Sequence, residues 1–308
     1  GGMTVESVDV SVIIPMHNGG ELIHEQLDAL AAQRTDLNWE VIVGDNRSTD
    51  GSPDAVRARA DSFPVPLAVV DAFRVQGASH ARNAAAAAAR GEVLAMCDAD
   101  DRVAPDWVEQ AFRGVREIAP MVAGANRLLS HPQRPDAPLL NPRILHGRGA
   151  QTCNAAVRRD VFLASGGFDE SLPPYGVEDS DLSARVLAAG HTIAPHPGLV
   201  LYFRETTGLK AKLRKIHSSG QAEAVLWSRG HEAQGTPLAE SQFVVALAAL
   251  PADAVRTARA RELRSLPKWT LREAAVRTGR WRGYRRWVKT GKAGEPRLPF
   301  LDGRGGAA

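Results

Sequence analysis

Three carboxylates stand among four consecutive residues at the end of an apolar run, in the stretch EVLAMCDADDR that begins at Glu92. They belong to Asp98, Asp100 and Asp101. Carboxylates this close repel one another unless a positive group lies between them, so the stretch requires a solvated turn, an ion pair or a metal ion. The alternative is a purely structural turn, in which the aspartates accept hydrogen bonds from the local backbone.

A second acidic stretch, VEDSD, begins at Val177 and contains Glu178, Asp179 and Asp181. An aspartate has a reference pKa of about 3.9, so it is ionised at neutral pH and can accept a proton as a general base. The alternative is that all three acids belong to the first turn of a helix, where negative charge suits the helix dipole.

The elements that must position these acids alternate regularly. Apolar, β-branched segments predict strands buried on both faces at 10–15, 39–45, 66–71 and 92–98. Helical patterns separate them at 21–33, 52–59 and 79–90. Strands that alternate with helices predict an α/β protein with a parallel sheet and right-handed crossovers.

Three of the predicted strands end in an aspartate, namely Asp45, Asp71 and Asp98. In a parallel sheet the carboxyl ends of the strands meet at one edge, and ligands collect there near the point where the strand order reverses. We therefore expect these three carboxylates to lie at one edge of the sheet, in a binding site.

The pattern is less regular after Asp101. It predicts helices and strands at 105–118, 121–126, 179–189 and 199–203. The polar, proline-rich segment 130–149 is a candidate loop over a site. From Lys210 onward the sequence is helical in pattern and basic, which predicts two parts, a domain at 3–205 and a helical basic region at 206–308.

Composition and charge separate the same two parts. The chain has 308 residues, of which 44% are apolar, enough for a substantial core. Residues 1–200 hold 17 Lys and Arg against 26 Asp and Glu, a balance of −9, whereas residues 201–308 hold 21 against 9, a balance of +12. The basic part indicates an anionic partner, and an ordinary solvated charged helix is the equal alternative.

Five sequence motifs occur in an order that resembles family 2 glycosyltransferases. Within residues 10–205 they are SVIIPMHN, VGDNRSTDGS, GASHARNAAAAAARGE, CDADD and GGFDESLPPYGVEDSDLSARVLAAGH. The resemblance implies an inverting, nucleotide-sugar-dependent enzyme of the GT-A fold. That fold is a Rossmann-like, mostly parallel mixed sheet flanked by helices, here with a helical basic C-terminal extension. Each motif alone is weak, but five in this order outweigh a chance match.

The resemblance also implies a nucleotide-sugar site at the carboxyl ends of the first strands. Asp98 would face the ribose or the metal, and Asp100 would hold Mg2+ or Mn2+ against the diphosphate. Asp45 would accept hydrogen bonds from the nucleobase or the ribose. A divalent cation suits this role because it screens the charge of the leaving diphosphate.

Three further residues are assigned to the nucleotide sugar by the same resemblance. Pro15 and His17 occupy the position at which relatives often carry an aromatic residue near the base, and a plain loop histidine is the alternative for His17. Arg82 would offer forked donors to the diphosphate. A salt bridge to a strand-end aspartate is the alternative for Arg82.

In the last motif the family pattern makes Asp179 the catalytic base and leaves Glu178 to orient the acceptor or its loop.

The sequence departs from the family elsewhere. Arg47 replaces a common glycine, which would crowd its loop or add a phosphate contact. Many relatives carry a histidine as a further metal ligand where this chain has Phe203 and Arg204. His196 is the candidate substitute, although a histidine between two prolines is more often structural.

The basic region contains the segment GRWRGYRRWVK at 279–289. This composition is typical of an interfacial segment on an anionic membrane, but aromatic residues spaced by three are equally consistent with a packed helix face. No apolar run approaches the about 20 residues that span a bilayer, and two cysteines without metal-binding spacing favour a reducing cytoplasm. We expect a cytoplasmic protein, with peripheral attachment to the inner face of the cell membrane left open.

The sequence thus predicts transfer of a sugar from a UDP-, GDP- or dTDP-sugar to a hydroxyl group of a glycan, lipid-linked or small-molecule acceptor, with Mg2+ or Mn2+ as cofactor. One alternative is a nucleotidyltransferase acting on a sugar phosphate, but IPMHNGGELI lacks the basic residue that such enzymes carry after the first strand. The other is a catalytically inactive nucleotide-sugar-binding module, which the presence of both CDADD and VEDSD disfavours. No recognisable nucleic-acid-binding module is present, so nucleic acid is not an expected partner.

Overall fold

The computed structural model describes residues 7–130, 149–233, 235, 238–260 and 266–303. The loop expected at 130–149 lies almost entirely outside these residues. The chain forms two compact units. The sheet unit comprises residues 1–170, 179–205 and 297–308, and the helical unit comprises residues 171–178 and 206–296.

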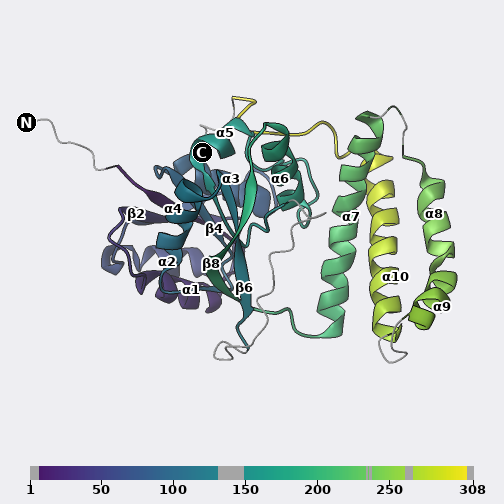
Figure 1. The fold of residues 1–308 in the computed structure, drawn as a ribbon, viewed down its shortest axis with the longest axis horizontal. Helices are drawn as coiled ribbons and strands as arrows, with labels where there is room; N and C mark the ends of the chain where they lie inside the picture. Colours follow the sequence, from purple (N-terminus) through teal and green to yellow (C-terminus); the bar gives the residue numbers. More distant parts are fainter. Residues whose placement is uncertain (1–6, 131–148, 234, 236–237, 261–265, 304–308) are drawn as a thin grey trace, which may run out of the picture. The chain divides into compact units, whose positions relative to one another are not determined.

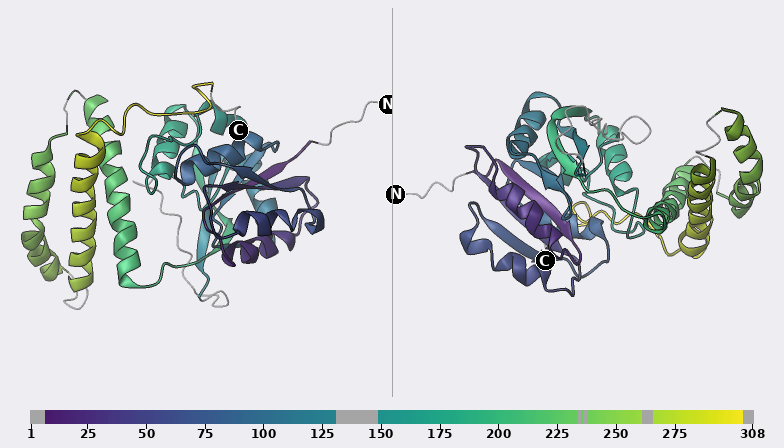
Figure 2. Two further views of the ribbon diagram at one scale, coloured as in Figure 1. Left: turned by 180° about the vertical axis from the view of Figure 1, so that it is seen from behind. Right: turned by 90° about the horizontal axis from the view of Figure 1, so that it is seen from below.

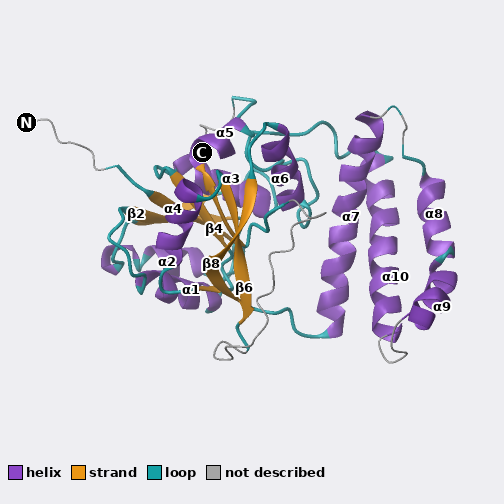
Figure 3. Ribbon diagram, viewed as in Figure 1, coloured by secondary structure: helices purple, strands orange, loops and turns teal. Residues whose placement is uncertain are grey.

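The described residues of the sheet unit form one mixed sheet of eight strands (Figure 1, Figure 3). The strands are β1 Val10–Met16, β2 Trp39–Asp45, β3 Leu67–Asp71, β4 Val93–Cys97, β5 Arg102–Val103, β6 Met121–Leu128, β7 Asn154–Arg158 and β8 Ile193–Phe203. Their spatial order is β3-β2-β1-β4-β7-β6-β8-β5. Only β7 and β5 run antiparallel to the rest. The mostly parallel mixed sheet expected from the sequence is therefore confirmed.

Helices cover both faces of this sheet. They are α1 Leu22–Ala31, α2 Ser52–Arg57, α3 Ala78–Ala88, α4 Trp107–Glu117, α5 Arg159–Ala164 and α6 Glu178–Ala188. Along β1, Val12 and Ile14 enter one apolar cluster with side chains of α1 and α4, whereas Ile13 enters a second with side chains of α3, α5 and α6. Successive strand residues point to opposite faces, so burial on both sides produces the continuous apolar runs seen in the sequence.

Helix α3 lies close against β2. A Cβ atom added to Gly44 would lie 2.2 Å from the carbonyl oxygen of Ala81, so only glycine allows this approach. The small alanine side chains of α3 serve the same packing, since Ala85 and Ala86 are fully buried. This position brings the first turns of α3, and with them Arg82, to the edge where β2 and β4 end.

The last described residues of the chain return to the sheet unit and form its tail segment, residues 297–302. The Arg297 amide donates to Asp169 Oδ1 at 2.9 Å. The Phe300 ring packs edge-on against Phe162, with 5.7 Å between ring centres. A Cβ added to Gly167, whose φ is 73°, would lie 2.6 Å from the Phe300 ring. The second glycine of the GGFDE motif therefore gives room to the tail segment.

The helical unit consists of α7 Leu209–Ala233, α8 Glu240–Ala248, α9 Leu250–Ala260, α10 Leu266–Gly283 and a π-helix at Tyr284–Val288. α7 and α10 lie side by side (Figure 2). A Cβ added to Gly279 would lie 2.3 Å from the carbonyl oxygen of His217, and one added to Gly283 would lie 2.4 Å from that of Gln221. Glycines thus allow the two backbones to approach closely. Among the described residues, no helix has the length and apolar composition needed to cross a bilayer.

Candidate active site

The carboxyl ends of β1, β2 and β3 lie side by side at one edge of the sheet. In its register Asp45 is the partner of Met16 on one side and of Asp71 on the other. Asp45 is 2% exposed and accepts a hydrogen bond from the Ser48 amide at 3.1 Å. Asp71 is exposed and pairs with Arg57 at 3.0 Å. The strand ends therefore meet as expected, but only Asp45 of this pair is enclosed.

Arg82 and Asp98 form an ion pair at the end of β4. The Arg82 guanidinium donates to Asp98 Oδ1 at 2.7 Å, and its side chain is 4% exposed whereas that of Asp98 is 32% exposed. The guanidinium also lies 5.5 Å from the centre of the Phe168 ring. The sequence left two roles open for Arg82, a contact to the diphosphate and a salt bridge to a strand-end aspartate. The salt bridge is present in the structure. The pair fixes the orientation of Asp98.

The acidic cluster consists of Asp98, Asp100 and Asp101, and one carboxylate oxygen of each lies within 4.8 Å of the others. Asp101 is 1% exposed and accepts a hydrogen bond from the Arg204 amide at 2.7 Å, whereas Asp100 is exposed. Oxygen atoms at this spacing match the ligands that Mg2+ and Mn2+ take. The side chains of Asp98 and Asp100 therefore fit a divalent cation, while Asp101 ties the turn to the strand β8.

Arg204 supports the same turn from the end of β8. Its guanidinium donates to the Asp100 carbonyl oxygen at 2.8 Å and to the Glu25 carboxylate at 2.6 Å. His196 lies elsewhere on β8, where its Nε2 donates to Gln110 Oε1 at 3.1 Å and burial lowers its pKa. Among the described residues His196 is not part of the acidic cluster.

Pro15 and His17 lie at the end of β1, beside the end of β2. Pro15 is half-buried and pairs with Gly44 in the sheet register. His17 is exposed, and its Nδ1 donates to the carbonyl oxygen of Asn46 at 2.8 Å. One ring nitrogen is therefore used to hold the imidazole next to Asp45.

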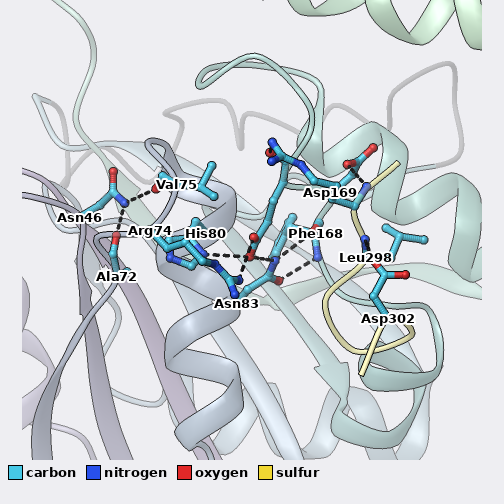
Figure 4. Close-up of polar contacts among 12 residues, drawn as sticks. Asn46, Ala72, Arg74, Val75, His80, Asn83, Phe168, Asp169, Leu298 and Asp302 are labelled. Atoms are coloured by element: carbon cyan, nitrogen blue, oxygen red, sulfur yellow. Dashed lines mark hydrogen bonds and ion pairs between the residues drawn. The ribbon is translucent and has the colours of Figure 1, made fainter. Parts of the chain in front are cut away.

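Asn46 and Arg47, the two residues that follow Asp45, donate hydrogen bonds to the loop between β3 and α3. The sequence did not reveal this role. Asn46 donates to the carbonyl oxygens of Ala72 at 2.5 Å and Val75 at 2.8 Å (Figure 4). Arg47, at a φ of 64°, donates from Nη2 to the carbonyl oxygen of Phe73 at 2.6 Å. Arg47 thus binds a loop carbonyl group. The sequence analysis had expected it either to crowd its loop or to contact a phosphate.

A buried polar network joins the first turns of α3 to Glu170 (Figure 4). The sequence analysis did not predict this network. Glu170, the last residue of the GGFDE motif, is 5% exposed. Its carboxylate accepts from His80 Nδ1 at 2.9 Å, Asn83 Nδ2 at 3.0 Å and Arg74 at 3.2 Å. Burial alone would raise the pKa of Glu170, but the hydrogen bonds from His80 and Asn83 and the positive charges nearby outweigh it, so the pKa is lowered.

This lowered pKa predicts a pH dependence of stability. A carboxyl group whose pKa is lower in the folded than in the unfolded chain stabilises the fold above its ordinary pKa, which is 4.5 for a glutamate, and that stabilisation is lost as the pH falls through the folded pKa. We expect Glu170→Gln to flatten the fall in the free energy of unfolding below pH 4.5, measured by urea titration. Glu117→Gln, on the exposed side of α4, is the control and should keep the wild-type slope. Equal slopes in all three proteins would contradict this role of Glu170.

The acids of the VEDSD stretch begin α6. Glu178 and Asp179 are both half-buried, and Asp179 Oδ1 accepts a hydrogen bond from the Ser180 amide at 2.8 Å. Val177, directly before them, has a φ of 61°, a left-handed conformation that is rare for a β-branched residue. Asp181 forms an ion pair with Arg185 at 2.6 Å, as a first-turn acid can. Asp181 is thus engaged within its own helix.

Comparison with known proteins agrees with this arrangement. The profile of glycosyl transferase family 2 matches residues 11–165, and that of the N-terminal domain of galactosyltransferase matches residues 141–207. Glycosyltransferase AglE of Haloferax volcanii is 28% identical over 194 residues, which cover 60% of this chain and 63% of AglE. Validoxylamine A glucosyltransferase of Streptomyces hygroscopicus is 26% identical over 255 residues, which cover 70% of this chain and 58% of that protein. The chain spans less than two thirds of the length of these relatives.

Solved structures share the fold. The mannosyltransferase PcManGT from Pyrobaculum calidifontis, solved with GDP-Man and Mn2+, superposes with a TM-score of 0.64 at 22% identity, over 92% of this chain and 89% of that one. TarS 1-349 of S. aureus, solved with UDP-GlcNAc, gives a TM-score of 0.55 at 19% identity, over 92% of each chain. The fold is that of the GT-A glycosyltransferases.

Proposed function

The chain belongs to glycosyltransferase family 2, and on that premise we propose that it moves a sugar from a nucleotide-diphosphate donor to a hydroxyl group of an acceptor, with inversion at the anomeric carbon. This proposal rests mainly on the acidic cluster at the end of β4, in which Asp98 pairs with Arg82. It supplies the charge pattern that a diphosphate and its cation require.

In this proposal Asp98 and Asp100 hold Mg2+ or Mn2+, which would screen the charge that builds up on the departing diphosphate. Asp45 accepts hydrogen bonds from the base or ribose, with Pro15 and His17 beside it. Enclosure supports this role, because a carboxylate that is 2% exposed at the end of β2 is already oriented by the Ser48 amide. The UDP-, GDP- and dTDP-sugars are the candidate donors, in line with the GDP-Man and UDP-GlcNAc found in the two solved relatives.

Asp179 is the proposed base and Glu178 orients the acceptor. Inversion requires the acceptor hydroxyl to attack from the face opposite the diphosphate, and a carboxylate on that face takes its proton. The pairing of Asp181 with Arg185 within α6 suits a helix-start acid, and it disfavours Asp181 as the base. The acceptor class is a glycan, a lipid-linked or a small-molecule hydroxyl compound, and the place of action is the cytoplasm or the inner face of the membrane.

The test is a panel of UDP-, GDP- and dTDP-sugars incubated with the full chain and either Mg2+, Mn2+ or a chelator. We expect one donor to release its nucleoside diphosphate only when the metal is present. Formation of a nucleotide sugar from a nucleoside triphosphate and a sugar phosphate would replace the proposal with nucleotidyl transfer. Thermal stabilisation by nucleoside diphosphates with Mn2+, without turnover of any donor or acceptor, would indicate an inactive binding module.

A further inference from the structure

Trp281, Tyr284 and Trp287, which gave the basic region the composition of an interfacial segment, are partly buried and pack against the core of the helical unit. Trp281 and Tyr284 lie against a cluster that contains Phe243, and Trp287 lies against a second cluster that contains Val225. The indole Nε1 of Trp281 donates to Glu240 at 3.2 Å. These rings are therefore committed to the unit's own core, and exposed apolar surface must be sought elsewhere.

Exposed apolar side chains gather instead on α8 and α9, which follow one another in the chain. In the helical unit, α10 lies between this pair and α7 (Figure 1, Figure 2). Val244, Val245 and Val255 are 50%, 65% and 56% exposed. Ala248 and Ala252 are exposed as well. Val244 and Ala248 are one helical turn apart, as are Ala252 and Val255, so each helix presents an apolar strip. We call these five residues the α8–α9 face.

The same stretch carries no charge. From Ser241 to Ala252 the sequence reads SQFVVALAALPA, without a single Asp, Glu, Lys or Arg. Phe243 points inward and is 4% exposed, which leaves the valines on the opposite side of α8. Pro251 stands in the first turn of α9, where a proline starts a new helix rather than continuing the old one. An uncharged twelve-residue segment with exposed apolar side chains is unusual for a surface that meets only water.

Two acids, Glu240 and Asp253, directly flank this uncharged stretch, and basic residues predominate in the rest of the helical unit. Arg256 follows Val255 and pairs with Asp253, and its side chain remains 74% exposed. Lys268 and Arg272, in the first turns of α10, are exposed. Residues 206–296 together hold 18 Lys and Arg against 7 Asp and Glu, an excess of 11 positive charges.

We propose that the α8–α9 face is a docking surface for a lipid bilayer that contains anionic lipids. Apolar side chains of an interfacial helix enter the boundary between head groups and acyl chains, while nearby arginines and lysines meet the anionic head groups. A second copy of the chain is a poorer occupant, because contact through this face would bring two strongly positive helical units together. This inference concerns a surface outside the donor site and does not depend on the proposed transfer reaction.

The experiment is cosedimentation of the full chain with phosphatidylcholine vesicles, prepared with and without phosphatidylglycerol. We expect binding to the anionic vesicles, release by added salt, and little binding to the neutral vesicles. The double variant V244S/V245S should bind anionic vesicles about tenfold more weakly, because it removes two apolar side chains from the contact. Arg256→Gln should weaken binding to the same vesicles about fivefold.

Ile118→Ser is the matched control, because Ile118 is 49% exposed on the sheet unit. It should bind like the wild type. All variants should first show the wild-type melting temperature and circular dichroism, and a milder V245T replaces any that does not. Wild-type binding by the folded valine variant would overturn the proposal, as would equal binding to neutral and anionic vesicles. A dimer in solution that V244S/V245S dissociates would assign the face to a second copy instead.

Discussion

Asp179→Asn is expected to lower the rate of sugar transfer by ~10² to 10⁴-fold, the usual contribution of a general base. The change keeps the volume of the side chain and one acceptor oxygen, so the hydrogen bond from the Ser180 amide can persist. It removes the negative charge and with it the ability to take a proton. Because a base acts as the new bond forms, the loss should fall on kcat, while affinity for the donor stays near that of the wild type.

The measurement is steady-state transfer to an authentic acceptor, together with calorimetric titration of the nucleoside diphosphate. Asp181→Asn is the neighbouring control, since Asp181 is paired with Arg185 within α6. It should retain most of the transfer rate. Full activity in Asp179→Asn would show that the base lies elsewhere, and an equally large loss in Asp181→Asn or in a Glu178 variant would identify its place.

Asp100→Ala is expected to abolish metal-dependent binding of the donor while the protein remains folded. Asp100 is the exposed member of the acidic cluster, so its side chain can be removed without opening a cavity in the core. Asp101 would be a poor choice for this test, because it is 1% exposed and holds the Arg204 amide. Its loss would disturb the turn itself and confuse metal binding with folding.

Calorimetry with a nucleoside diphosphate, in the presence of Mn2+ and of a chelator, measures this effect. The wild type should bind at least tenfold more tightly with the metal, a difference of about 1.4 kcal/mol, and the variant should show no such difference. Asp106→Ala is a control a few residues along the chain, where the carboxylate is exposed just before α4. If Asp100→Ala kept the metal-dependent gain, the cation would have to be held by other groups.

The parts of the fold that the sequence predicted are those in which burial alone determines residue type. The strands β1, β2 and β4 are covered on both faces, so their apolar runs could be recognised without knowledge of their neighbours. β7 was missed because its sequence, NAAVR, has a single β-branched residue and owes its strand form to pairing with β4 and β6. β8 begins at Ile193 rather than near residue 199, because two prolines and a glycine interrupt its pattern.

The site was predictable to the same degree. The acidic cluster follows a strand directly, so topology alone located it. The contacts of Arg47 and Glu170 were not predictable, because each joins segments far apart in the chain and neither has a local pattern. The aromatic residues near position 284 allowed two interpretations, and in the structure they contact the core of the helical unit. Their spacing by three could not distinguish a membrane-facing side of a helix from a packed one. Spacing shows that the residues share one side of a helix, but not what contacts that side.

The tail segment determines where the protein can be shortened. A recombinant fragment that stopped at residue 205 would contain every strand of the sheet but would lose Phe300 and Arg297. The ring of Phe162 would then lose an edge-on partner, and the backbone around Gly167 would be exposed to water. Such a fragment is expected to express poorly or to aggregate, although it contains every acidic residue of the candidate site. Affinity tags are therefore better placed at the amino terminus, far in sequence from the residues that close the sheet unit.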